Sequence, residues 1–129
     1  MTLIEITVVI LVLLTLIAVL FIGANIYKKG ADRAACILNI RNVHQAVRAN
    51  QNLKGKNVGD ALVLADDIYS SATVERYLTQ PTCPTGPVAT AVYTPAGTVY
   101  PDVGTAAVSC ELYALEAAGD HGPDDTAGW

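Results

Sequence analysis

The stretch ITVVILVLLTLIAVLFIGANIY, from Ile6 to Tyr27, decides how the N-terminal part of this chain folds. It contains no charged residue, and the nearest charges are Glu5 before it and Lys28 after it. About 20 consecutive apolar residues are enough for a helix to cross the hydrocarbon core of a bilayer. A cleaved secretory signal would instead carry a basic segment, a shorter apolar core and a small-residue cleavage site. We therefore expect residues 1–27 to form a hydrophobic, membrane-spanning helix.

Glu5 is the unusual residue of this segment, because it is an ionisable group at the start of an apolar helix. Burial of a carboxylate in a membrane costs a few kcal/mol on insertion scales unless the group has a partner. An α-amino group one helical turn away, in the same chain or in a neighbour, is one candidate partner. The helix dipole also favours an acid at this position, so Glu5 can equally be a helix-start carboxylate at the interface.

The helical pattern continues beyond the apolar stretch. No proline occurs before Pro81, and Cys36, Ile40, Val43 and Val47 recur at helical spacing. This spacing predicts an apolar stripe that faces the rest of the protein, with Cys36 a buried apolar residue rather than a reactive thiol. We expect one helix to about residue 52, with residues 28–52 as its amphipathic continuation.

Charge is distributed unevenly along the chain. The region from residue 57 onward has ten acidic residues and one arginine, whereas the predicted amphipathic helix is basic. Its cationic stripe is either a solvated face or a surface that packs against acidic heads of other subunits. No basic patch alternates with base-stacking aromatic residues, so we expect no nucleic-acid contact. The residues assigned to subunit packing are Lys29, Arg33, Arg41 and Arg48, with His44 beside them.

Residues 53–129 are predicted to form a small globular head of the α+β class. Glycine and proline turn signals separate three short β-like segments, at 88–94, 98–100 and 106–112, after a connecting loop with short helical pieces at 61–78. These strands should form a small antiparallel sheet against the helix. Cys83 and Cys110 flank this region, and we predict a disulfide between them and therefore an oxidising compartment. Closing that loop would stabilise the head by roughly 3 kcal/mol.

Residue patterns for catalysis are missing from the sequence. It has no Gly-x-Ser-x-Gly, no phosphate-binding Gly-x-x-x-x-Gly-Lys and no Cys-x-x-Cys. His44 and His121 are expected to be solvated, and the acidic residues at 120, 124 and 125 lack the alternating spacing of a calcium loop. We expect no enzymatic activity, no cofactor and no metal.

The N-terminal residues resemble a known family. Residues 1–6, Met-Thr-Leu-Ile-Glu-Ile, followed by Thr-Val-Val-Ile-Leu, look like the mature N-terminus of type IV pilins and type II secretion pseudopilins. The segments 35–43, 81–86 and 109–110 resemble, more loosely, a compact pilin subgroup with a cysteine-bridged head. The chain departs from the family in having Met1 where phenylalanine is usual and Ile22 where proline is often found.

This resemblance implies a structural role. A prepilin peptidase would remove a leader, Met1 would be N-methylated, and Glu5, with Thr2 and Leu3 next to it, would act in assembly by pairing with a neighbour's amine. The partners would be further copies of the chain, the inner membrane before assembly, the peptidase and the assembly machinery. The product would be an extracellular pilus-like filament on the cell surface, built from lollipop-shaped subunits.

Two alternatives stay open. Within the same class, the chain is a minor pilin or a type II secretion pseudopilin. In another class, it is a singly membrane-anchored protein with a small binding head, in which Glu5 has no partner. Lys28 and Lys29 favour a cytoplasmic location for that end of the segment, which is opposite to the pilin orientation.

Overall fold

The computed structural model describes residues 2–69, 77–84, 93–110 and 121–129. Met1, with its predicted methylation, and the part of the predicted first strand at 88–92 lie outside these ranges. The chain divides into two compact units, Met1–Ala31 and Asp32–Trp129. They are described separately below as unit 1 and unit 2.

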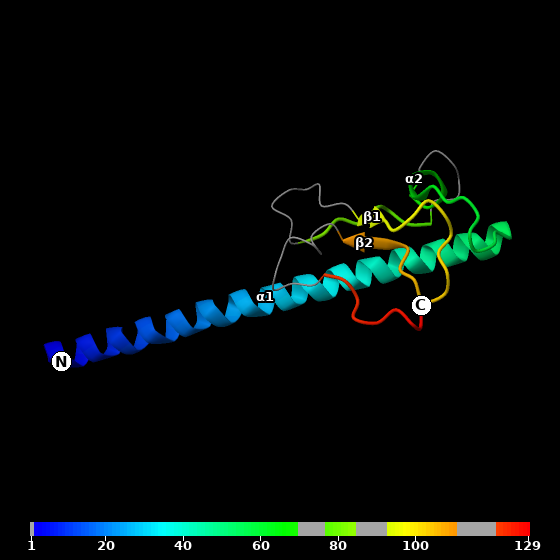
Figure 1. Ribbon diagram of the computed structural model, residues 1–129. Coiled ribbons are helices and arrows are strands. Elements are labelled where there is room, and N and C mark those ends of the chain that lie inside the picture. Colours follow the sequence, from blue (N-terminus) through cyan, green and yellow to red (C-terminus); the bar gives the residue numbers. More distant parts are fainter. Residues whose placement is uncertain (1, 70–76, 85–92, 111–120) are drawn as a thin grey trace. The chain divides into compact units, whose positions relative to one another are not determined.

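Helix α1 extends from Leu3 to Lys54 (Figure 1). Its end is fixed by Gly55, whose φ of 61° is a left-handed conformation that glycine adopts without a steric penalty. The next amide, of Lys56, donates a hydrogen bond of 2.9 Å to the carbonyl oxygen of Gln51. Such a bond across a left-handed glycine is the Schellman arrangement that ends many helices. The long N-terminal helix predicted from the sequence is therefore present, two residues longer than expected.

The core of unit 2 is built on one face of α1. The predicted stripe of Cys36, Ile40, Val43 and Val47 is at most 1% exposed. Apolar side chains from the rest of unit 2 pack against it in one cluster. This confirms the predicted apolar stripe, including the burial of Cys36. The other members of this core are Leu62, Leu64, Ile68, Cys83, Tyr93, Tyr100, Ala107, Val108 and Cys110.

The described sheet has two short antiparallel strands, β1 (Tyr93–Pro95) and β2 (Val108–Cys110), beside the second half of α1 (Figure 1). The register pairs Tyr93 with Cys110 and Pro95 with Val108. The side chains of Val108 and Cys110 are buried and that of Ser109 is exposed, as expected for a sheet with one face on the core. An α+β arrangement with a small antiparallel sheet was predicted and is observed.

The predicted strand at 98–100 is wrong in detail. Val99 forms only an isolated antiparallel bridge with Ala61. Two flanking hydrogen bonds of 2.9 Å join Leu62 to Thr98 and Tyr100 to Asp60. Regular pairing ends there because the Asp60 amide donates to the Asn57 carbonyl oxygen, and the Gly59 amide donates to that of Tyr100 instead, both at 3.1 Å.

Within the described residues of the predicted connecting segment, 61–69 and 77–78, there is one short helix, α2 (Leu64–Asp67). The side chain of Asp67 accepts a hydrogen bond of 3.0 Å from the amide of Val63, which holds the start of this turn. Asn50 of α1 donates a hydrogen bond of 3.0 Å to the Asp67 carbonyl oxygen and accepts one from the Tyr100 hydroxyl. This buried amide thereby ties α2 and the 98–100 segment to α1.

Candidate functional site

Unit 1 exposes almost all of its apolar surface. The large apolar side chains between residues 3 and 27 are 47–80% exposed in the described part of the chain. Helix α1 is long and apolar enough near its N-terminus to cross a membrane, by length and composition. This surface is the first candidate functional feature.

The two threonine hydroxyls of this segment are satisfied within the helix. Thr7 and Thr15 each donate a hydroxyl hydrogen bond of 2.8 Å to a carbonyl oxygen three residues earlier, that of Ile4 and Val12 respectively. Side-chain hydroxyls that bond back to their own helix need no water. The two threonines therefore do not oppose burial of the segment in lipid or in protein.

Glu5 has a partner inside the chain. Its Oε2 atom accepts a hydrogen bond of 3.0 Å from the backbone amide of Thr2. A glutamate at the third position of a helix that reaches back to the residue before the helix is half of a capping box. The predicted assembly residues Thr2 and Leu3 thus lie at the helix start, with Thr2 held by Glu5. Of the two roles considered for Glu5 from the sequence, this contact corresponds to the helix-start carboxylate rather than to pairing with an α-amino group.

The cations predicted to pack subunits have different environments. Lys29 and Arg41 are exposed. Arg33 pairs with Asp124 of the same chain, with 2.9 Å between Nη2 and Oδ1. The Arg48 guanidinium is hydrogen-bonded within α1. Two of the four predicted residues, Arg33 and Arg48, therefore have partners within the same chain, and Lys29 and Arg41 are exposed.

His44 was predicted to be solvated, and this is wrong, because its side chain is only 3% exposed. It adjoins Val43 on α1, and the Trp129 ring covers it edge-on, with ring centroids 5.6 Å apart. Its Nε2 atom accepts a hydrogen bond of 3.3 Å from Arg48 Nε, which requires a neutral imidazole. Burial lowers the pKa of His44 below its usual value of 6.5, and the Arg48 charge lowers it further.

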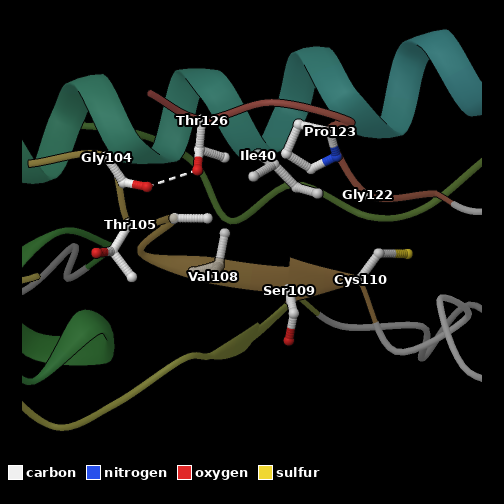
Figure 2. Close-up of a pocket in the computed structure, with 10 residues that line it drawn as sticks. Ile40, Gly104, Thr105, Val108, Ser109, Cys110, Gly122, Pro123 and Thr126 are labelled. Atoms are coloured by element: carbon white, nitrogen blue, oxygen red, sulfur yellow. Dashed lines mark hydrogen bonds between the residues drawn. The ribbon is translucent and has the colours of Figure 1, made fainter. Parts of the chain in front are cut away.

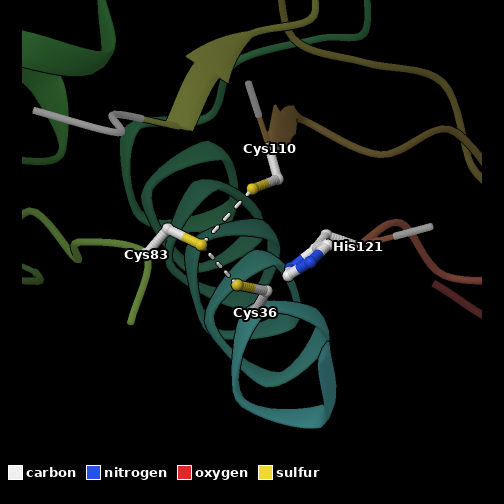
Figure 3. Close-up of side chains that lie close together, drawn as sticks. All are labelled: Cys36, Cys83, Cys110 and His121. Atoms are coloured by element: carbon white, nitrogen blue, oxygen red, sulfur yellow. Dashed lines mark hydrogen bonds between the residues drawn. The ribbon is translucent and has the colours of Figure 1, made fainter. Parts of the chain in front are cut away.

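The second candidate feature is a cluster of three cysteines and a histidine in unit 2. Cys36 comes from α1, Cys83 from the 77–84 segment, Cys110 from the end of β2, and His121 from the C-terminal segment (Figure 3). One ligand atom from each of these residues lies within 4.8 Å of all the others. All four side chains are buried, and His121, at 2% exposure, was wrongly predicted to be solvated.

The C-terminal segment brings His121 to the core because several contacts attach it to the rest of unit 2. Besides the Arg33–Asp124 ion pair, the Thr126 hydroxyl donates to the Gly104 carbonyl oxygen, and the Gly104 amide donates to the Trp129 carbonyl oxygen at 3.3 Å. None of these contacts has a local signal in the sequence. Their positions depend on the tertiary fold.

Cys36, which was predicted only to pack in the core, lies close to Cys83 of the predicted Cys83–Cys110 disulfide. The Sγ atoms of Cys83 and Cys110 are 3.7 Å apart, and those of Cys36 and Cys83 are 2.7 Å apart. No disulfide joins any two of these three cysteines in the structure. Burial, together with the hydrogen bond to Cys83, raises the pKa of the Cys36 thiol to about 12. The fold thus joins the predicted disulfide pair to a third sulfur and an imidazole.

A pocket of about 240 Å³ opens next to this cluster, between α1, β2 and the C-terminal segment (Figure 2). Cys110 and Gly122 line it on the cluster side, and Ile40 lies on the α1 side. No charged side chain is among its lining residues in the described part of the chain. The lining groups that could act as nucleophiles are the Cys110 sulfur and the hydroxyls of Thr105, Ser109 and Thr126, and no charged acid or base stands beside them among the described lining residues.

No family model matches the chain, and no curated protein or solved structure is significantly similar to it.

Proposed function

We propose that this chain is a structural subunit of a type IV pilus-like filament. The observation that carries the proposal is the apolar N-terminal segment of α1, which is bare in the isolated chain and has a single carboxylate, Glu5, at its start. Such a helix is stable in lipid, and it is equally stable when neighbouring copies of itself cover it. The N-terminal resemblance to pilins and pseudopilins favours a helix that lies first in lipid and is then covered by neighbouring copies in a filament.

Transfer from lipid to a filament core gains little from the hydrophobic effect, because lipid tails are as apolar as leucine. Helix association in membranes depends instead on van der Waals fit and on polar pairs. Glu5 supplies the polar pair: a carboxylate in the apolar core costs a few kcal/mol unless it is neutralised, and the α-amino group of an adjacent subunit neutralises it. In this proposal the amine is exposed by prepilin peptidase and methylated at Met1.

Exposed charge of both signs supports packing between copies. Lys29 and Arg41 are exposed cations of α1, whereas Asp66, Asp102 and Asp125 are exposed acids of the head. Opposite charges exposed on one subunit attract copies of that subunit and fix their register more than they add affinity. In this proposal the cations of one copy contact the acids of the next.

Substitution of Glu5 tests the proposal. We expect Glu5→Ala and Glu5→Lys to abolish filament assembly while membrane insertion, measured by resistance to alkaline extraction, is unchanged. Glu5→Gln is the sharper variant, because glutamine still accepts the hydrogen bond from the Thr2 amide but carries no charge. Normal filament yield from Glu5→Gln would show that Glu5 acts only as a helix cap.

A singly anchored membrane protein is the second candidate, and one contact favours it. Glu5 already has the Thr2 amide as a partner, so it does not require a second chain. This candidate predicts monomers in detergent and in membranes, with no N-methylation. Intact mass with N-terminal fragmentation, together with negative-stain microscopy of the same native fraction, separates it from the filament subunit. Long surface filaments would further separate a major pilin from a minor pilin or a pseudopilin.

A further inference from the structure

Four side chains that share one chemistry converge in unit 2 from four separate segments. Cys36, Cys83, Cys110 and His121 contribute three sulfur atoms and one imidazole, all buried and all mutually within 4.8 Å (Figure 3). Figure 3 shows these side chains directed toward one another. Three cysteines and one histidine are an established ligand set for structural zinc, which is bound tetrahedrally by four protein ligands.

The spacing of the ligand atoms suits one ion. Tetrahedral ligands with zinc–sulfur bonds of about 2.3 Å are separated by about 3.8 Å from each other. The Cys83 and Cys110 sulfurs are 3.7 Å apart, and the largest separation in the cluster is within 4.8 Å. The Cys36 and Cys83 sulfurs, at 2.7 Å, need to move apart by about 1 Å. Rotation of the two cysteine side chains about their χ1 angles can supply this displacement without a change in the backbone.

A disulfide accounts for fewer of these residues. It would use two of the three sulfurs and would leave the third thiol and the imidazole of His121 beside it in the core. It also needs an oxidant that removes two hydrogen atoms. Zinc binding needs none: three thiols release three protons, the neutral imidazole donates its lone pair, and no electron is transferred. The ion uses all four groups, so the composition of the cluster favours it.

The groups next to the cluster support a fixed ligand arrangement. Tyr93, which pairs with Cys110 in the sheet register, accepts a hydrogen bond of 3.1 Å from Asn39. Asn39 and Cys36 are both on α1, so this contact holds the Cys36 region of the helix in register with β1.

We propose that Cys36, Cys83, Cys110 and His121 bind one Zn²⁺ ion as a structural site that joins α1, the 77–84 segment, β2 and the C-terminal segment. The ion cross-links parts of the chain up to 85 positions apart in sequence, and the free energy of its binding adds to the stability of unit 2. The site lies in unit 2 alone and does not depend on filament assembly. Absence of zinc would therefore leave the filament proposal intact, and absence of filaments would leave the zinc site intact.

The test uses the full chain purified in mild detergent with a phosphine reductant. Zn²⁺ is added, unbound metal is removed by gel filtration, and the zinc that remains with the protein is measured by inductively coupled plasma mass spectrometry. We expect one zinc per chain. Replacement by Co²⁺ should give the strong visible absorption of tetrahedral cobalt and the near-ultraviolet band of thiolate ligation, which report the ligand set without any substitution.

His121→Gln and His44→Gln form a matched pair of variants, because both histidines are buried but only His121 lies in the cluster. Loss of a contact to a ligand already weakens metal binding by about 10–100-fold, so loss of a ligand should cost more than ~100-fold in zinc affinity. His121→Gln should show this loss in competition with a chromophoric chelator, and His44→Gln should bind as the parent does. The proposal is overturned by a folded parent chain without stoichiometric zinc, by a cobalt spectrum without thiolate bands, by undiminished affinity in His121→Gln, or by native material whose intact mass shows a disulfide.

Discussion

At the scale of single residues, His44 links the buried face of α1 to the C-terminal Trp129 in its neutral form. Its pKa is lowered in the fold by burial and by Arg48, whereas the unfolded chain has the usual value of 6.5. As the pH falls below about 6.5, His44 therefore binds a proton in the unfolded state while it is still neutral in the folded state. The free energy of unfolding decreases over this range, until the pH is below the folded pKa of His44 as well. Above pH 6.5 both states are neutral, and His44 makes no pH-dependent contribution.

We accordingly expect the free energy of unfolding to fall between pH 7.5 and pH 5 more steeply in the parent chain than in His44→Gln. The measurement is denaturant unfolding in detergent at a series of pH values, followed by the fluorescence of Trp129, the single tryptophan. The difference between parent and variant removes the contributions of other titrating groups, because these are common to both. Parallel pH profiles would contradict a neutral, buried His44.

Asn50 is the second residue whose burial yields a prediction. It is fully buried, it donates to the Asp67 carbonyl oxygen at 3.0 Å, and it accepts from the Tyr100 hydroxyl. Asn50→Ala leaves two buried polar groups without their partner and should reduce the free energy of unfolding by about 2–4 kcal/mol. Asn52→Ala, in the same helix but exposed, should change it by less than about 0.5 kcal/mol. Equal effects from the two variants would exclude the buried network.

The cysteine and histidine cluster illustrates what residue patterns alone can reveal. Cys36 was predicted to be buried because it falls on a periodic stripe, and it is. Its neighbours Cys83, Cys110 and His121 are 47 to 85 positions away, with no Cys-x-x-Cys pair to signal a shared site. The one available signal was the odd cysteine left over after a predicted disulfide, together with a single histidine near the C-terminus. Only the tertiary fold places these groups together.

At the scale of elements, the prediction of α1 succeeded because its signals are local and repeated. The uncharged apolar run, the apolar stripe at helical spacing and the absence of proline each predict a helix, and together they cover α1, which has 52 residues. The strands were harder to predict because they are three residues long, and their bounds depend on the partner that pairs with them. The segment at 98–100 has the composition of a strand, yet it finds only a short partner around Ala61 and ends at Pro101.

The buried stripe of α1 gives a prediction at this scale. Ile40 is 1% exposed, whereas Leu38, two positions away on the same helix, is 58% exposed. Ile40→Ala should destabilise unit 2 by about 2–5 kcal/mol, because it removes buried methyl groups and leaves a cavity. Leu38→Ala should change the free energy of unfolding by less than about 0.5 kcal/mol. Denaturant unfolding followed by Trp129 fluorescence measures both, and a larger effect at Leu38 would mean that the opposite face of the helix packs in the monomer.

At the scale of the whole molecule, the chain combines two units with different solvent requirements. Every residue of the hydrophobic core belongs to unit 2, from Cys36 to Cys110, whereas the described residues of unit 1 have only exposed side chains. The apolar surface of unit 1 must be covered by lipid, detergent or other chains.

This division predicts that residues 32–129, expressed without unit 1, fold as a soluble monomer. Their Trp129 emission and their denaturant midpoint should match those of unit 2 in the full chain, since the core and the His44–Trp129 contact are retained. The full chain should sediment with membranes and aggregate when detergent is removed, because its apolar helix is then exposed to water.

A matched comparison is the full chain with Leu13→Lys and Leu14→Lys. These changes place two charges in the centre of the apolar segment and should prevent membrane insertion, because each charge costs about 2.5–3.5 kcal/mol on insertion scales, while unit 2 stays folded. Non-cooperative unfolding of residues 32–129 would show instead that unit 1 contributes to the stability of the head, and the two units would then have to be treated as one.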